Sequence, residues 1–439
     1  MTFTPRQKNI VIFVVLIVLV IIFIGVKFHR TASRPVTLEM WGIIDDPQVI
    51  SSLTTKYHRL YPNVSIKYSS KKQETYPQEL LQAFASDKSP DVFMLFGNWL
   101  PLYEDKITPL NIQRDKILNL KTFNELYPEA AGQELIQGEY LKGIPLYIDT
   151  LSLYYNKDVF NYYNIALPPA TWEEVLKLVP QLRKTSPEGQ ITKAAIAMGT
   201  GSNTNWSTDI LAALMMQQGS SVIDPQTKQV TFQESRRESD SSYKMISPGE
   251  EALKFYTQFA NPRSRYYTWG SEFLNSVPVF TMDGASMLIG YNRAQKIIKE
   301  NNPGLNYGIA PLPHFANSST NVNVASIMTL VVSKRSPHSQ IAWDFLKFLA
   351  QKDNAQFYFL QTKNPPARRD LIQSYLTDPQ AGVFIGQTLS SKTWYQPDFQ
   401  QVFQIFNDMI DSVLKQGIDP ARAIMNAADR INLIIKQNK

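Results

Sequence analysis

Aromatic rings that stand beside carboxylate and amide side chains are the residues of this sequence best suited to holding a ligand. Five tryptophans have Gly, Asn, Ser or Pro close by, which places them near turns: Trp41, Trp99, Trp206, Trp269 and Trp394. Polar side chains that could surround such rings are Asp45, Asn98, Asp149, Asn205, Asp283 and Asn292. A sugar ring has an apolar C–H face and a rim of hydroxyls, so it requires flat rings and fixed hydrogen-bonding groups together. The pattern predicts a site for an uncharged, hydroxyl-rich solute, without a metal or a cofactor.

Core packing is the commoner role of any single tryptophan, and it competes with this interpretation at each position. Trp172 lies in a capped first helical turn and Trp343 lies on an apolar helix face. Both are predicted to be core residues.

Motifs of catalytic centres are missing from the sequence. The four histidines are scattered, and no HExxH, GxSxG or GxxxxGK[ST] motif occurs. The run Gly199–Gly201 has two glycines of a dinucleotide fingerprint but lacks the third, so it is interpreted as a polar turn. The absence of cysteine excludes disulfides, thiol catalysis and a lipid-bearing cysteine. An enzyme that processes glycans stays open as an alternative, and its candidate acids are Asp45, Asp46, Asp149 and Asp283.

The net charge of +6 comes largely from the first 30 residues. Four of the 44 basic residues and none of the 38 acidic residues fall there, which leaves 40 basic against 38 acidic residues in the remainder. No basic domain is left, and we expect no nucleic-acid partner.

Residues 10–26 form an unbroken apolar run of 17 residues between basic flanks. Its length is at the short end for a membrane span and exceeds the core of a cleavable signal peptide. We favour an uncleaved transmembrane anchor over a removed signal, with residues 1–9 cytoplasmic and 27–35 a linker. Charge alone does not orient the span, because basic residues occur on both sides.

Short strand patterns alternate with helical patterns in the remainder of the chain, which is typical of α/β layers. Strands are predicted at 37–41, 64–68 and 91–96, with a strand pair within 143–156. Helices are predicted after Asp46-Pro47, over 75–86, after the capping box Thr171–Glu174, and after Ser336-Pro337 and Asp419-Pro420. In the helix over 75–86, Leu80, Leu81 and Phe84 are expected on the inner face.

Six stretches in a fixed order resemble the extracellular solute-binding proteins of ABC transporters, in the large family 1 that includes maltose-binding proteins. They are Leu38–Trp41 with Asp45–Pro47, Ser89–Phe93, Gly143–Asp158, Pro168–Glu174, Tyr307–Pro313 and Ala342–Leu349. The resemblance covers residues 36 to about 435. It implies a two-lobed periplasmic-binding-protein-like α/β fold with crossing hinge strands, which closes around a solute in the cleft. The expected lobes are 36–147 with 304–345, and 148–303 with 346–439.

The same resemblance implies where the ligand is contacted. The positions that match the family are Asp45 and Asp46 after the first strand, Asn98 and Trp99 after the third, Asp149 near the hinge, Asn205 and Trp206 in a loop of the second lobe, Tyr291 after Gly290, and Trp394 in a late segment. Trp41, Trp269 and Asp283 complete the candidate set. Asp283 departs from the family, because it occupies a position that usually holds glycine.

As a function, the resemblance implies a membrane-anchored, monomeric receptor outside the cell membrane. It would capture a carbohydrate and deliver it to the permease of an ABC importer, without catalysis. A receptor for a phosphorylated polyol or another anion is the main alternative, and Arg368-Arg369 is the compact basic pair that such a ligand would use. An adhesive surface protein is disfavoured because no repeats occur.

Overall fold

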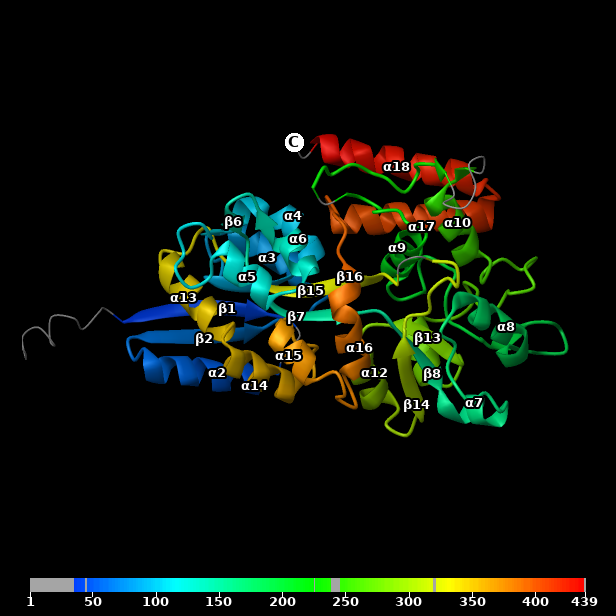
Figure 1. The fold of residues 1–439 in the computed structure, drawn as a ribbon, viewed down its shortest axis with the longest axis horizontal. Coiled ribbons are helices and arrows are strands. Elements are labelled where there is room, and N and C mark those ends of the chain that lie inside the picture. The colour runs from blue at the N-terminus through cyan, green and yellow to red at the C-terminus, as the bar shows by residue number, and fades with distance from the viewer. Residues whose placement is uncertain (1–34, 44–45, 225, 238–244, 319–320, 438–439) are drawn as a thin grey trace, which may run out of the picture. The chain divides into compact units, whose positions relative to one another are not determined.

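The computed structural model describes residues 35–43, 46–224, 226–237, 245–318 and 321–437 (Figure 1). These residues divide into two compact units, one ending at Val92 and the other beginning at Phe93. The predicted anchor at 10–26 lies outside the described residues. Within the described part of the chain, no helix combines the length and the apolar character that a membrane span requires.

The first unit pairs two parallel strands with two helices. Its elements are β1 (Val36–Gly42), α2 (Pro47–Leu60), β2 (Val64–Ser70) and α3 (Tyr76–Ala85). All four were predicted at these places. Leu81, predicted to face inward from α3, is instead 48% exposed, because Leu80 and Phe84 already occupy the inner face and a consecutive residue points about 100° away.

The second unit contains the remaining elements. Its strands are β3 (Val92–Phe96, which starts at the boundary), β4 (Leu110–Asn111), β5 (Ile136–Gln137), β6 (Tyr140–Leu141), β7 (Ile144–Thr150), β8 (Ser152–Asn156), β9 (Lys184–Thr185), β10 (Ile191–Lys193), β11 (Arg236–Arg237), β12 (Met245–Ile246), β13 (Met287–Gly290), β14 (Tyr307–Pro311), β15 (Asn323–Val332) and β16 (Ser391–Lys392). Its helices are α4 (Leu100–Tyr103), α5 (Leu120–Leu126), α6 (Glu129–Leu135), α7 (Lys157–Tyr162), α8 (Trp172–Leu182), α9 (Ser207–Gln217), α10 (Pro248–Thr257), α11 (Ser276–Thr281), α12 (Ala294–Asn301), α13 (Ser339–Leu349), α14 (Lys352–Thr362), α15 (Arg369–Ser374), α16 (Gly382–Gln387), α17 (Phe399–Gln416) and α18 (Pro420–Gln437). Short 3₁₀ turns are η1 (Gly97–Trp99), η2 (Glu104–Lys106) and η3 (Thr388–Ser390).

Two consecutive strands of this unit belong to different sheets. β7 pairs antiparallel with β15, whereas β8 is the middle strand of the antiparallel sheet β13-β8-β14. Only Leu151 separates β7 from β8. The predicted strand pair within 143–156 therefore consists of two strands that do not pair with each other, and the chain crosses from one sheet to the next at this point.

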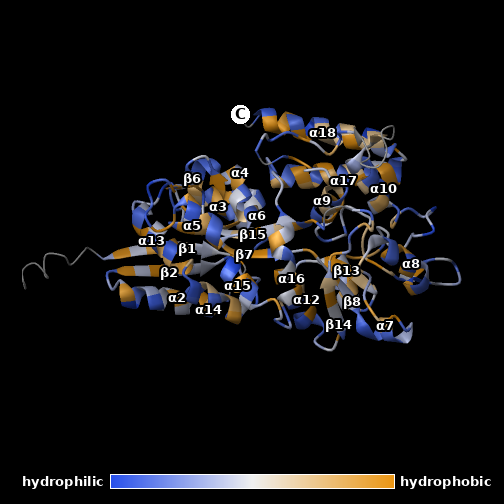
Figure 2. Ribbon diagram, viewed as in Figure 1, coloured by the Kyte–Doolittle hydropathy of each residue, from blue (hydrophilic) through white to orange (hydrophobic). Residues whose placement is uncertain are grey.

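Helices α9, α10, α17 and α18 pack against one another in the second unit (Figure 1). In α18, the predicted apolar positions Ile424, Ala428, Ile431 and Ile435 are buried, and Figure 2 shows hydrophobic and hydrophilic residues interspersed along the helix. The spacing of these positions thus predicted the buried face correctly.

Two further predictions meet different outcomes in this unit. Trp172 and Trp343 are core residues, with 0% and 3% of their surface exposed. The helix predicted after Ser336-Pro337 begins only at Ser339, because the Ser336 hydroxyl accepts the backbone N–H of His338 and holds a turn there instead.

Candidate functional site

The junction of β7 and β8 places the carboxyl of Asp149 inside the second unit, where 1% of the residue is exposed. Its Oδ1 accepts the backbone N–H of Thr150 and the backbone N–H of Asn292, both at 2.9 Å. The backbone N–H of Arg293 also bonds this carboxyl. Burial raises the pKa of Asp149 to about 6, although the Arg293 charge and these N–H groups oppose the rise. Asp149 therefore fixes the backbone at Asn292 and Arg293.

Arg293 is the centre of a cluster of aromatic rings and acids. Its guanidinium carbon lies 4.2 Å from the ring centre of Tyr291 and 5.2 Å from those of Phe96 and Trp206. Its Nη1 is 3.9 Å from Asp149 Oδ2. The three rings and the buried carboxylate all attract the Arg293 cation, and this attraction is strong because the site is largely desolvated.

A second acid, Asp209 in the first turn of α9, completes the cluster. Its Oδ2 accepts the Tyr291 hydroxyl at 2.9 Å. Burial raises the pKa of Asp209, while the Tyr291 hydroxyl, the Arg293 charge and the Trp394 indole lower it. Trp206 packs edge to face on Tyr291, with 5.6 Å between the ring centres. Its backbone is left-handed, with a φ of 58°.

Trp99 joins the cluster through Phe96. The ring centre of Trp99 lies 5.1 Å from that of Phe96 and 4.9 Å from that of Phe399, on which Trp99 stacks. These contacts leave Trp99 7% exposed. Asn98 Nδ2 donates to Gln396 Oε1 at 3.2 Å. The structure thus brings three predicted positions, Asp149, Trp206 and Tyr291, together around Arg293, and Trp99 reaches this cluster through Phe96.

Four other candidates have structural partners elsewhere in the second unit. Trp269 is fully buried, stacks on Phe273 and donates to Thr200 Oγ1 at 3.1 Å. Asn205 Oδ1 accepts the backbone N–H of Val277 and so caps α11.

Asp283 and Arg368 are each held by charges of the chain itself. Asp283 accepts from Lys193 and from Asn156. Arg368 makes a two-bonded ion pair with Asp370 at 2.8 and 3.0 Å, so its charge is not available to an anion. We leave Trp269, Asn205, Asp283 and Arg368 out of the proposed site.

The remaining candidates belong to the first unit. Trp41 is partly exposed in β1, and the Lys71 ammonium lies 3.9 Å from its ring centre. Asp45 lies outside the described residues. Asp46 caps α2 by accepting the backbone N–H of Gln48 at 2.8 Å.

Replacing Asp46 with alanine should therefore lower the free energy of unfolding by about 1 kcal/mol through the lost helix cap. Urea denaturation measures this loss, and Asp46→Asn, which can still cap, should show little of it. An unchanged denaturation midpoint in Asp46→Ala would contradict the capping role.

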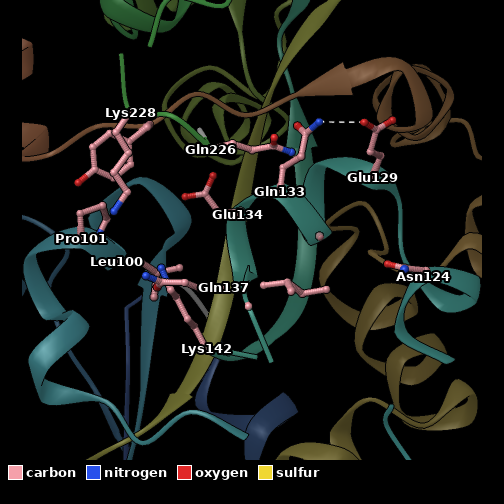
Figure 3. Close-up of a pocket in the computed structure, with 14 residues that line it drawn as sticks. Leu100, Pro101, Asn124, Glu129, Gln133, Glu134, Gln137, Lys142, Gln226 and Lys228 are labelled. Carbon is pink, nitrogen blue, oxygen red and sulfur yellow. Dashed lines mark hydrogen bonds between the residues drawn. The ribbon is translucent and has the colours of Figure 1, made fainter. Parts of the chain in front are cut away.

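A cavity of about 570 Å³ lies in the second unit (Figure 3). Two of its lining residues, Leu100 and Tyr395, directly follow Trp99 and Trp394 in the sequence, which places the cavity beside these tryptophans. Its volume lies within the range of small-molecule sites. Its polar lining comes from three separate segments and consists of Asn124, Glu129, Gln133, Glu134, Gln137, Lys142, Gln226, Lys228 and Tyr395. Amides, carboxyls, ammonium groups and a phenol can hydrogen-bond a hydroxyl-rich ligand from several directions.

Sequence reasoning missed Arg293 and Glu134. The only local signal for Arg293 is a basic residue three positions beyond a buried strand. Nothing in the sequence near Glu134 distinguishes it from its neighbour Glu129, because its role depends on the cavity around it.

The family model for bacterial extracellular solute-binding proteins matches residues 43–356. The chain belongs to this family. The galactooligosaccharide-binding protein of Bacillus subtilis is 20% identical to this solute-binding protein over 405 residues, which cover 91% of this chain and 90% of the relative.

Solved structures of solute-binding proteins resemble the chain as well. The sugar-binding protein MalE of Xanthomonas citri superposes with a TM-score of 0.72 at 21% identity, covering 92% of this chain and 98% of that one. The cyclic α-maltosyl-1,6-maltose binding protein of Arthrobacter globiformis has a TM-score of 0.74 at 17% identity, covering 92% and 100%. This solute-binding protein therefore has the two-lobed α/β fold that the sequence predicted.

Proposed function

We propose that this solute-binding protein captures an uncharged carbohydrate in the cavity beside the Arg293 cluster and delivers it to an ABC importer. The observation that carries the proposal is the polar lining of the cavity, which three segments distant in the sequence supply together. The names of relatives agree with a carbohydrate ligand, since they include galactooligosaccharide- and maltodextrin-binding proteins.

The chemistry of the cavity favours hydroxyl groups over a strong anion. Of the two lysines in its lining, Lys142 is paired with Glu104 at 3.0 Å, and Glu129 and Glu134 add negative charge. The Lys228 ammonium lies 4.8 Å from the ring centre of Tyr395. Without convergent arginines, a phosphate would gain little here, whereas hydroxyls can pair with amides and carboxyls.

The buried cluster has a supporting role in this proposal. Trp99, Trp206, Tyr291 and Trp394 pack against their own chain, so they fix the segments that carry the lining residues. Closure of the lobes around the sugar follows the hinge motion of binding proteins. The apolar run at 10–26 would keep this monomeric receptor at the outer face of the membrane, close to its permease.

The direct test is a thermal-shift screen of the full chain in detergent against maltose, maltotriose, galactotriose and tagatose. Ligand at about 100 times its dissociation constant should stabilise the folded state by about 2.7 kcal/mol, which raises the melting temperature of a chain of this size by about 3 °C. Glucose 6-phosphate and glycerol 3-phosphate are the contrasting arm. If the phosphate esters raise the melting temperature and the sugars do not, the proposal is overturned in favour of an anion receptor.

An enzymatic role has little support in the site. Asp46 caps a helix, Asp149 is bonded by backbone N–H groups, and Asp283 is paired with Lys193. Among the described acids proposed for glycan cleavage, none has a free carboxylate opposite a second one.

A further inference from the structure

We propose that Glu134 contacts the ligand directly and hydrogen-bonds its hydroxyl groups. This inference rests on the proposed function and names a ligand-contacting residue within the same cavity.

The side chain of Glu134 packs against Gly97 of η1. A Cβ atom at Gly97 would lie 2.8 Å from Cγ of Glu134 and 3.1 Å from its Oε1. A contact of 2.8 Å essentially never occurs for a Cβ atom, so a larger residue at position 97 would require the Glu134 side chain to shift. Figure 3 shows the Glu134 carboxyl among side chains of several segments, with Lys228 on one side and Gln133 on the other.

Thr393 acts on Glu134 and not on the ligand, because its buried hydroxyl does not line the cavity. This hydroxyl lowers the pKa of Glu134.

The charge state of Glu134 makes this contact sensitive to pH. Burial raises the pKa of Glu134 to about 7, against the opposing effects of Thr393 and the Lys142 charge. The other charged or titratable groups of the lining are Glu129, Lys228 and Tyr395, and Glu104 faces Lys142 from η2. Above pH 7 the ionised carboxylate accepts hydroxyl protons strongly, and below pH 7 the neutral acid binds them less well. Affinity should therefore rise as the pH increases through 7.

The experiment is calorimetric titration of the full chain in detergent with maltotriose, or with the screened sugar that gives the largest thermal shift. The wild-type protein should bind about tenfold more tightly at pH 8.5 than at pH 5.5, because only a few per cent of Glu134 is ionised at the lower pH. Glu134→Gln, which keeps the shape of the side chain, should bind about tenfold more weakly at pH 8.5 and should lose the pH dependence. Thr393→Val should weaken binding less and keep the pH dependence.

Glu125→Gln is the matched control, since Glu125 is an exposed acid on the neighbouring α5 and is not part of the cavity. It should bind as the wild type does at both pH values. If the wild type binds sugar but Glu134→Gln retains its affinity and its pH dependence, the inference about Glu134 is overturned while the proposed function stands. If the wild type binds none of the sugars, the proposed function itself fails.

Discussion

Arg293→Ala is expected to lower the free energy of unfolding by about 3 kcal/mol at pH 8, since removing one partner of a buried ion pair leaves the other uncompensated. The change strips Asp149 of its nearest positive charge and takes the guanidinium away from the rings of Phe96, Trp206 and Tyr291. We also expect sugar affinity to fall at least tenfold, because these rings anchor the segments beside the cavity. Urea denaturation and calorimetric titration measure the two effects.

The pH dependence of this loss separates charge from packing. Without Arg293, the pKa of Asp149 should rise above about 6, so protonation at pH 5 relieves the unpaired charge. The stability deficit of Arg293→Ala should thus be smaller at pH 5 than at pH 8. In the background Asp149→Asn, the Arg293→Ala change should cost less than it does alone. An equal deficit at both pH values would show that only packing is lost.

Asp149→Asn is expected to flatten the pH dependence of stability between pH 4 and pH 6. Because the folded-state pKa of Asp149 is about 6 and its ordinary value is 3.8, the folded protein holds the proton across this window and the unfolded chain does not. The contribution of the carboxyl to stability is therefore fully present below pH 3.8 and is lost as the pH rises through 6. A shift of about two units corresponds to about 3 kcal/mol. Thermal denaturation at half-unit pH steps compares the variant with the wild type.

Asp149→Ala provides the contrast to this substitution. It removes the acceptor of three backbone N–H groups as well as the charge, so it should be less stable than Asp149→Asn at every pH. Asp283→Asn serves as the control, because Asp283 is an exposed acid of the same unit outside the cluster. If stability changes with pH in Asp149→Asn as it does in the wild type, another group is responsible for the pH dependence.

Local signals predicted much of the fold. The Asp46 cap with its following proline, the capping box at Thr171 and the apolar spacing of α18 are each encoded within one element, and all appear as expected. The start of α13 was misplaced because the Ser336 side chain can bond either a helix or a turn, and the neighbouring residues decide between them.

The site was harder to predict, because tertiary packing decides which residue is available. Trp269 has a turn beside it in the sequence, yet it is fully buried in a core cluster, where it stacks on Phe273 and donates to Thr200. Arg293 carries no local pattern, and its importance arises only where β3, β7 and α9 bring their ends together around it. Of the predicted aromatic residues, Trp99, Trp206 and Tyr291 pack together with Phe96 and Arg293, and their role in binding a ligand stays a prediction.

The single residue Leu151 between β7 and β8 restricts how the two sheets can move. A connection of one residue has no slack, so it can bend but cannot lengthen. Relative motion of the sheets about this link has to be a swing, in which atoms far from Leu151 travel furthest. Inserting one glycine there would lengthen the connection and give the pivot slack, while β13 and β14 would still set the register of β8.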